Sequence, residues 1–124
     1  MAKVLIADDS RFHVQMLSSW LKDKGFDVLT AGDALQAWMS ALRLLPDAIV
    51  LDINMPAGSG VQVLKRLRSS GKTQNIPVVV VSGNDDVDVR AVVEQLGAAA
   101  YLQKPVHQEE LCSIIDRVLG KAIP

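Results

Sequence analysis

The chain has 124 residues, the length of one ordinary domain, and its 49% hydrophobic and 22% charged residues exclude a disordered segment. Its 13 Lys and Arg residues are offset by 14 Asp and Glu residues, so the formal net charge of −1 excludes a broad cationic surface for nucleic acid. With no apolar run of membrane-spanning length and no signal-peptide pattern, we expect a cytoplasmic protein that binds neither membranes nor, directly, nucleic acid.

Five short runs rich in Val, Ile and Leu alternate with stretches of helical period along the chain. This alternation predicts an α/β domain in which helices connect the strands of a parallel sheet. We expect one domain over 1–124, with an ordered core over about 3–120. The expected strands are 3–7, 27–31, 48–51, 77–82 and 99–102. The four valines at 78–81 lack polar alternation, which predicts a strand inside the sheet.

The intervals between these strands have the spacing of amphipathic helices, bounded by capping residues and glycines. The expected helices run from near Ser10 to Lys24, over 34–45, over 61–69, from the acidic pair at 85–86 to Gly97, and over 108–119. Their expected inner faces carry Val14, Leu17 and Leu21; Trp38, Ala41, Leu42 and Leu45; Val63, Leu64 and Leu67; Val89, Val92, Val93 and Leu96; and Leu111, Ile114, Ile115 and Val118.

Polar side chains stand where the expected strands end, and in a parallel sheet these ends meet at one crevice. Asp8 and Asp9 follow the first strand, Asp52 the third, Ser82 ends the fourth, and Lys104 follows the fifth. Three carboxylates raise one another's pKa unless a cation lies among them, and a site of oxygen ligands suits Mg²⁺. A lysine and a hydroxyl would bind phosphoryl oxygens, so the pattern predicts phosphoryl transfer. Singly, each residue also fits a helix cap, a turn or the surface.

These residues lie in four motifs, LIADDS, LDINMPAGSG, VVVVSG and AAAYLQKP. In order and spacing, over essentially the whole chain, the motifs resemble the receiver domain of bacterial response regulators. The resemblance implies a flavodoxin-like, doubly wound fold with a five-stranded parallel sheet of order 2-1-3-4-5 and helices on both faces. It also implies a signalling switch of a two-component system, not a metabolic enzyme, with intrinsic autophosphorylation and autodephosphorylation. The phosphodonor would be a histidine kinase or a histidine phosphotransfer protein.

The resemblance assigns a role to each residue at the crevice. Asp52 matches the phosphoacceptor that forms an acyl phosphate, and Lys104 matches the lysine that pairs with the phosphoryl group. Asp8, Asp9, Asp52 and the backbone carbonyl of Asn54 match the Mg²⁺ ligands, with Asp8 bound directly or through water.

The resemblance also implies how the signal would leave the site. Ser82 and Tyr101 match a switch pair in which the ring turns inward after the hydroxyl has moved. The output surface would comprise 86–96, 99–102 and 108–119, on which Val87 and Ala91 are expected off the inner helix face. The downstream protein or output domain is unknown, and dimerisation on phosphorylation is possible in such a switch. The family also predicts a cis peptide bond before Pro105.

Five other side chains complete the expectations from the sequence. Asn54 and Asn84 lie two residues beyond Asp52 and Ser82, at positions that influence the lifetime of the acyl phosphate in the family. His13 and His107 are expected to face solvent, since neither has a second histidine at ligand spacing. The single cysteine, Cys112, is expected to be a small buried or half-buried hydrophobe.

Three alternative functions remain open from the sequence. The AGSG segment at 57–60 could belong to a flavin- or nucleotide-binding module of flavodoxin-like architecture, although it lacks a true phosphate-loop pattern. A magnesium-dependent hydrolase with an aspartyl nucleophile would share the chemistry, but no segment for selecting a substrate is evident. The chain could also be the receiver part of a longer regulator with a DNA-binding or enzymatic output domain.

Overall fold

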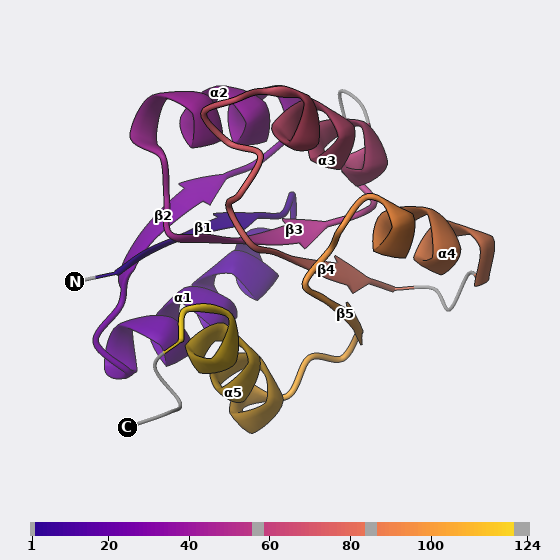
Figure 1. The fold of residues 1–124 in the computed structure, drawn as a ribbon. Helices are drawn as coiled ribbons and strands as arrows, with labels where there is room; N and C mark the ends of the chain where they lie inside the picture. The colour runs from indigo at the N-terminus through magenta and orange to yellow at the C-terminus, as the bar shows by residue number, and fades with distance from the viewer. Residues whose placement is uncertain (1, 56–58, 84–86, 121–124) are drawn as a thin grey trace.

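A computed structural model describes residues 2–55, 59–83 and 87–120, in which strands and helices alternate along the chain (Figure 1). The elements are β1 (Lys3–Ala7), α1 (Arg11–Asp23), β2 (Asp27–Ala31), α2 (Ala34–Leu44), β3 (Ala48–Asp52), α3 (Gly60–Ser69), β4 (Val78–Ser82), α4 (Val87–Gln95), β5 (Ala100–Gln103) and α5 (Gln108–Val118). The predicted alternation is confirmed; β3 and β4 differ from the predicted strands by one residue at one end, and β5 is shifted by one residue at both ends. None of the described helices is long and apolar enough to cross a membrane.

All neighbouring strands pair in parallel, and the order across the sheet is β2-β1-β3-β4-β5, as predicted. The register pairs Asp52 with Val81 across β3 and β4, and Ser82 with Gln103 across β4 and β5. The carboxyl ends of these strands are therefore level, so the residues at or just beyond them share one edge of the sheet.

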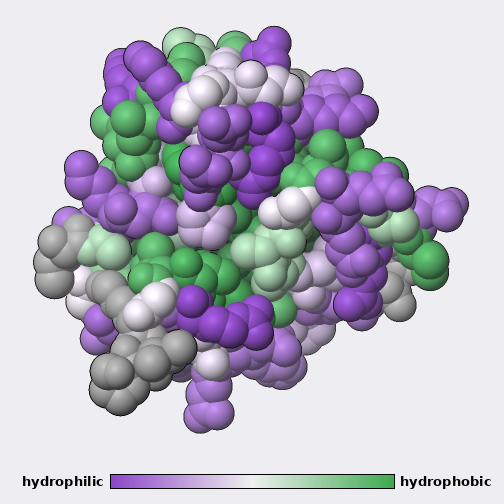
Figure 2. Space-filling model, viewed as in Figure 1, coloured by the Kyte–Doolittle hydropathy of each residue, from purple (hydrophilic) through white to green (hydrophobic). Residues whose placement is uncertain are grey.

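Helices cover both faces of the sheet, with α2, α3 and α4 on one face and α1 and α5 on the other (Figure 1). Because side chains of a strand alternate between the two faces, Val80 packs with the first group and Val81 with the second. Every residue of β3 and β4 is buried, which the valine run predicted for β4. Figure 2 shows hydrophilic side chains over most of the helix surfaces and a band of hydrophobic ones between the upper and lower helices.

Two predicted inner-face residues are exposed. Leu45 is 48% exposed because α2 ends at Leu44 and Leu45 takes a left-handed conformation, with φ of 46°, that leaves the helical stripe. Val92 in α4 is 38% exposed, whereas its neighbour Val93 is fully buried. Helix α4 therefore contacts the core through a narrower stripe than the sequence predicted.

Arg68, near the end of α3, joins this helix to the end of α4. Its Nε donates a hydrogen bond to the Leu96 carbonyl at 3.0 Å, and its Nη2 donates to the Gly97 carbonyl at 3.1 Å. Its Nη1 donates to the carbonyls of Gln74 at 3.0 Å and Ile76 at 2.9 Å. Gly97 ends the α4 turn with φ of 80°, a conformation that favours glycine. One guanidinium thus ties α3 and the segment before β4 to the end of α4.

Candidate functional site

Three carboxylates converge at the carboxyl edge of the sheet. Asp8 and Asp9 follow β1, and Asp52 is the last residue of β3. Each offers an oxygen, and these oxygens all lie within 4.8 Å of one another. The side chains of Asp8 and Asp52 are buried, whereas Asp9 is exposed. The structure therefore brings together the acidic residues that the sequence placed at one crevice, with two in the interior and one facing solvent.

Asp52 has a polar partner on each carboxylate oxygen. Its Oδ1 accepts the backbone N–H of Asn54 at 3.1 Å, and its Oδ2 accepts a hydrogen bond from Lys104 Nζ at 3.3 Å. The same Nζ lies 3.8 Å from Asp8 Oδ2. Burial raises the pKa of Asp52, the charge on Asp8 raises it further, and the Asn54 N–H and Lys104 only partly offset this. The Asp52 carboxylate is thus a buried anion that an additional cation would stabilise.

The predicted switch residues occupy the neighbouring strands. Ser82 ends β4 and is 2% exposed, and its carbonyl accepts the backbone N–H of Lys104 at 2.8 Å, which links the serine strand to the lysine. Tyr101 in β5 is half-buried, and the Arg90 guanidinium of α4 lies 5.2 Å from the centre of its ring. The Lys104–Pro105 bond is cis, as predicted. The side chain of Asn54 is exposed, and Asn84 lies outside the described residues.

Gly60 has a structural role next to Asp52 that the sequence did not reveal. Its N–H donates to the Ile53 carbonyl at 2.9 Å, and a Cβ at this position would lie 2.6 Å from the Asp52 carbonyl oxygen. Only glycine lets α3 begin this close to the backbone of Asp52. Ser59 caps α3 by accepting the N–H of Gln62. These contacts explain the second half of the AGSG segment without a bound phosphate, while 57–58 lie outside the described residues.

The prediction that His13 faces solvent is wrong. Its ring is buried, and Nδ1 is hydrogen-bonded to Oδ2 of Asp8. A signal for this was present in the sequence, since His13 lies four residues before Leu17 and eight before Leu21 on the same face of α1. His107 is exposed and Cys112 is buried, as predicted, and burial raises the pKa of the Cys112 thiol.

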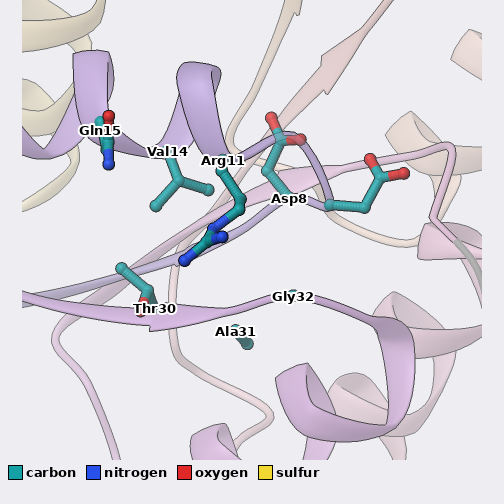
Figure 3. Close-up of a pocket in the computed structure, with 8 residues that line it drawn as sticks. Asp8, Arg11, Val14, Gln15, Thr30, Ala31 and Gly32 are labelled. Carbon is teal, nitrogen blue, oxygen red and sulfur yellow. The ribbon is translucent and has the colours of Figure 1, made fainter.

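A pocket of about 250 Å³ borders the carboxylates on the side of α1 and β2. Figure 3 shows Arg11, from the start of α1, with its guanidinium pointing toward the strand that carries Thr30. The residues that line the pocket are Asp8, Asp9, Arg11, Val14, Gln15, Thr30, Ala31 and Gly32. The acidic cluster therefore borders an open recess instead of being sealed within the core.

The donor set of this cluster fits a small, hard cation. Asp8, Asp9 and Asp52 offer only oxygen, and no sulfur or imidazole nitrogen belongs to the cluster. Mg²⁺ prefers oxygen ligands and retains several waters, which the exposed side of Asp9 would accommodate. The three carboxylates and one lysine leave the described site with an excess of negative charge, and a divalent cation would reduce their mutual repulsion.

Comparison with known proteins agrees with this geometry. The family model of the response regulator receiver domain matches residues 4–116. The transcriptional regulatory protein PrrA of Mycobacterium tuberculosis is 40% identical over 119 residues, which cover 96% of this chain and 50% of PrrA. Protein PilH of Pseudomonas aeruginosa is 34% identical over 120 residues, which cover 97% of this chain and 99% of PilH. The chain thus spans about half the length of PrrA and nearly all of PilH.

Comparison with solved structures supports membership in the same family. The chemotaxis response regulator CheY4 of Vibrio cholerae superposes with a TM-score of 0.88 at 33% identity, covering 95% of this chain and 98% of CheY4. The receiver domain of sensor histidine kinase PA1611 from Pseudomonas aeruginosa has a TM-score of 0.88 at 27% identity, covering 96% and 98% of the two chains. That structure is described with a magnesium ion coordinated in its active site cleft. The chain belongs to the response regulator receiver domain family of two-component systems.

Proposed function

We propose that this chain is a phosphorylation-dependent switch in which Asp52 accepts a phosphoryl group from a phosphohistidine of a kinase or phosphotransfer protein. An oxygen of the Asp52 carboxylate forms a bond to phosphorus while the phosphorus–nitrogen bond breaks, and the released imidazole nitrogen is protonated by solvent. The observation that carries the proposal is the position of Lys104 Nζ, 3.3 Å from Asp52 Oδ2 within a cluster of three carboxylates.

The residues around Asp52 have complementary roles in this transfer. Asp8, Asp9, Asp52 and the Asn54 carbonyl would hold Mg²⁺, which when bound supplies positive charge to the phosphoryl oxygens. Lys104 supplies a second point charge, since its Nζ lies 3.3 Å from Asp52 Oδ2. Because Lys104 also lies near Asp8, it would move from the carboxylates to a phosphoryl oxygen after transfer.

The proposed acceptor is tested by intact mass after incubation with acetyl phosphate and Mg²⁺, which requires no partner protein. Wild type should gain one phosphoryl group, and Asp52→Asn should gain none. Asp23→Asn is a matched control, because Asp23 is an exposed aspartate at the far end of α1. A phosphoryl gain by the Asp52→Asn chain at the wild-type rate would show that another residue is the acceptor. Wild type that is never labelled would argue against intrinsic autophosphorylation.

Ser82 and Tyr101 are proposed to carry the change away from Asp52. Ser82 ends the strand beside β3, and Tyr101 lies in the next strand under a side chain of α4, so a contiguous route leads from the acceptor to this helix. Ser82→Ala should still be labelled by acetyl phosphate, but amide exchange in α4 and β5 should no longer change on labelling. The same exchange response in the variant as in wild type would exclude Ser82 from the route.

The partner of the switch is proposed to bind at α4, β5 and α5. Val87 is 74% exposed in α4, and Ala91 on the same helix is also exposed. The likeness to PrrA supports an attached output domain, and the likeness to PilH supports a receiver that acts through protein contacts alone. The full-length gene decides between these two arrangements. Sedimentation of the labelled and unlabelled chain tests dimerisation on phosphorylation.

A further inference from the structure

The first turn of α1 holds both oxygens of the Asp8 carboxylate. The backbone N–H of Ser10 donates to Asp8 Oδ1 at 2.9 Å, and His13 Nδ1 is hydrogen-bonded to Asp8 Oδ2. The Ser10 hydroxyl in turn accepts the backbone N–H of His13 at 3.2 Å, which is the N-cap of the helix. The helix start, the histidine and the carboxylate therefore form one closed hydrogen-bonded unit.

The His13 ring uses one of its two nitrogens, Nδ1, for a hydrogen bond to Asp8. An ionised carboxylate only accepts hydrogen bonds, so the hydrogen between the two groups belongs to Nδ1. The other ring nitrogen, Nε2, is buried and has no hydrogen-bond partner among the residues that the structure describes. A buried polar atom without a partner is unfavourable, and a hydrophobic side chain of similar size would avoid this cost. The imidazole is therefore poorly explained as core packing and well explained by its bond to Asp8.

The two buried carboxylates of the cluster are restrained by different parts of the chain. Asp52 is held by Asn54 and Lys104, whereas Asp8 is held by Ser10 and His13 and lies farther from Lys104, at 3.8 Å. Since Asp8 is repelled by Asp52 and Asp9, its carboxylate would rotate away from them without a donor on Oδ2. His13 supplies this donor from within the core.

We propose that His13 is a positioning residue of the Mg²⁺ site: it holds the Asp8 carboxylate in the acidic cluster and thereby increases the affinity for the cation. The inference rests on the proposed function, because it takes the cluster as the Mg²⁺ site. Groups that hydrogen-bond to metal ligands fix the orientation of those ligands, and their loss typically lowers metal affinity by about 10- to 100-fold.

The test compares two substitutions with side chains of the same branched shape, of which only one has an N–H donor. Asn carries an N–H donor at the same number of bonds from the backbone as His13 Nδ1, and Leu carries a methyl group there. The Mg²⁺ dissociation constant of each chain is measured by calorimetry. We expect His13→Leu to weaken Mg²⁺ binding by about tenfold or more, and His13→Asn to bind close to wild type. His107→Leu, at an exposed histidine with no cap hydrogen bond from its side chain, is the matched control and should not change the affinity.

Unfolding of each variant in EDTA shows whether it folds without metal. If His13→Leu does not fold, His13→Gln replaces it, because Gln keeps an amide but places it one bond beyond Nδ1, and it should also weaken Mg²⁺ binding. Wild-type affinity in a folded Leu or Gln variant would overturn the role of His13. Equal loss in the Leu and Asn variants would overturn the role of the donor. Absence of Mg²⁺ binding by wild type would instead refute the proposed metal site.

Discussion

Helices α3 and α4 lie on the same face of the sheet and are nearly equal in length, but they are held very differently. Helix α3 buries Gly60, Val63, Leu64 and Leu67, and its first residue is packed against the backbone of Asp52. Helix α4 buries only Val93 among its described residues, and Val87 and Val92 are exposed. The difference places a firmly packed helix next to the proposed acceptor and a less firmly packed one on the proposed output surface, as a switch requires.

Truncation of one apolar residue on each helix, buried in α3 and exposed in α4, tests this difference with the largest expected effect. Leu64 is fully buried, so Leu64→Ala should lower the free energy of unfolding by about 3 kcal/mol. Val92→Ala, at a 38% exposed position in α4, should change it by less than about 0.5 kcal/mol. Urea unfolding measures both. Similar losses in the two variants would mean that α4 is as firmly packed as α3.

Arg68 is the polar connection between the two helices, and its removal should loosen α4 selectively. Arg68→Ala deletes hydrogen bonds to four backbone carbonyls and should cost about 2 kcal/mol of stability. Hydrogen exchange should rise in α4 more than in α3. Arg66→Ala, which removes only a guanidinium 5.6 Å from the Trp38 ring, is the control. Uniform acceleration of exchange over both helices would contradict a local role for Arg68.

The charge on Asp52, beside which α3 begins, is expected to have a smaller effect on the stability of the fold. Because the pKa of Asp52 is raised in the folded state, ionisation of Asp52 lowers the free energy of unfolding. This loss of stability is absent when the pH is below the ordinary pKa of 3.8, and it is complete when the pH is above the raised pKa. Without metal, Asp52→Asn should therefore unfold at a higher temperature than wild type at pH 7, and the difference should vanish as the pH falls toward 3.8. Thermal unfolding in EDTA measures it. An equal or lower midpoint at pH 7 would mean that Lys104 fully compensates the burial.

The smallest change in free energy is expected from removal of the contact between Arg90 of α4 and Tyr101 of β5. Arg90 lies over the Tyr101 ring, and a cation–π contact at such an exposed site contributes about 0.5 kcal/mol. Arg90→Ala should increase the fraction of Tyr101 rings turned inward before phosphorylation. Tyr101 is the only tyrosine in the chain, so its NMR signals report this directly. Arg117→Ala on α5 is the control, and unchanged Tyr101 rotamers in both variants would remove Arg90 from the switch.

The strands and the acidic crevice could be predicted because they depend on local patterns and on one rule of topology. Apolar runs such as the valines of β4 locate the strands, and parallel pairing brings the residues that follow them to one edge. The close approach of Gly60 and the contacts of Arg68 could not be predicted, because both depend on how distant segments pack. His13 could have been placed from its spacing to Leu17, but a histidine was expected to prefer solvent.

The hydrogen bonds from Arg68 to the carbonyls of Leu96 and Gly97 also determine which end of α4 can move. A helix anchored just beyond its last residue pivots about that end, so displacement grows with distance along the axis and is greatest at Val87, about 14 Å from Leu96. Small adjustments near Tyr101 would thereby be amplified at an exposed apolar residue, which is where a partner would detect them.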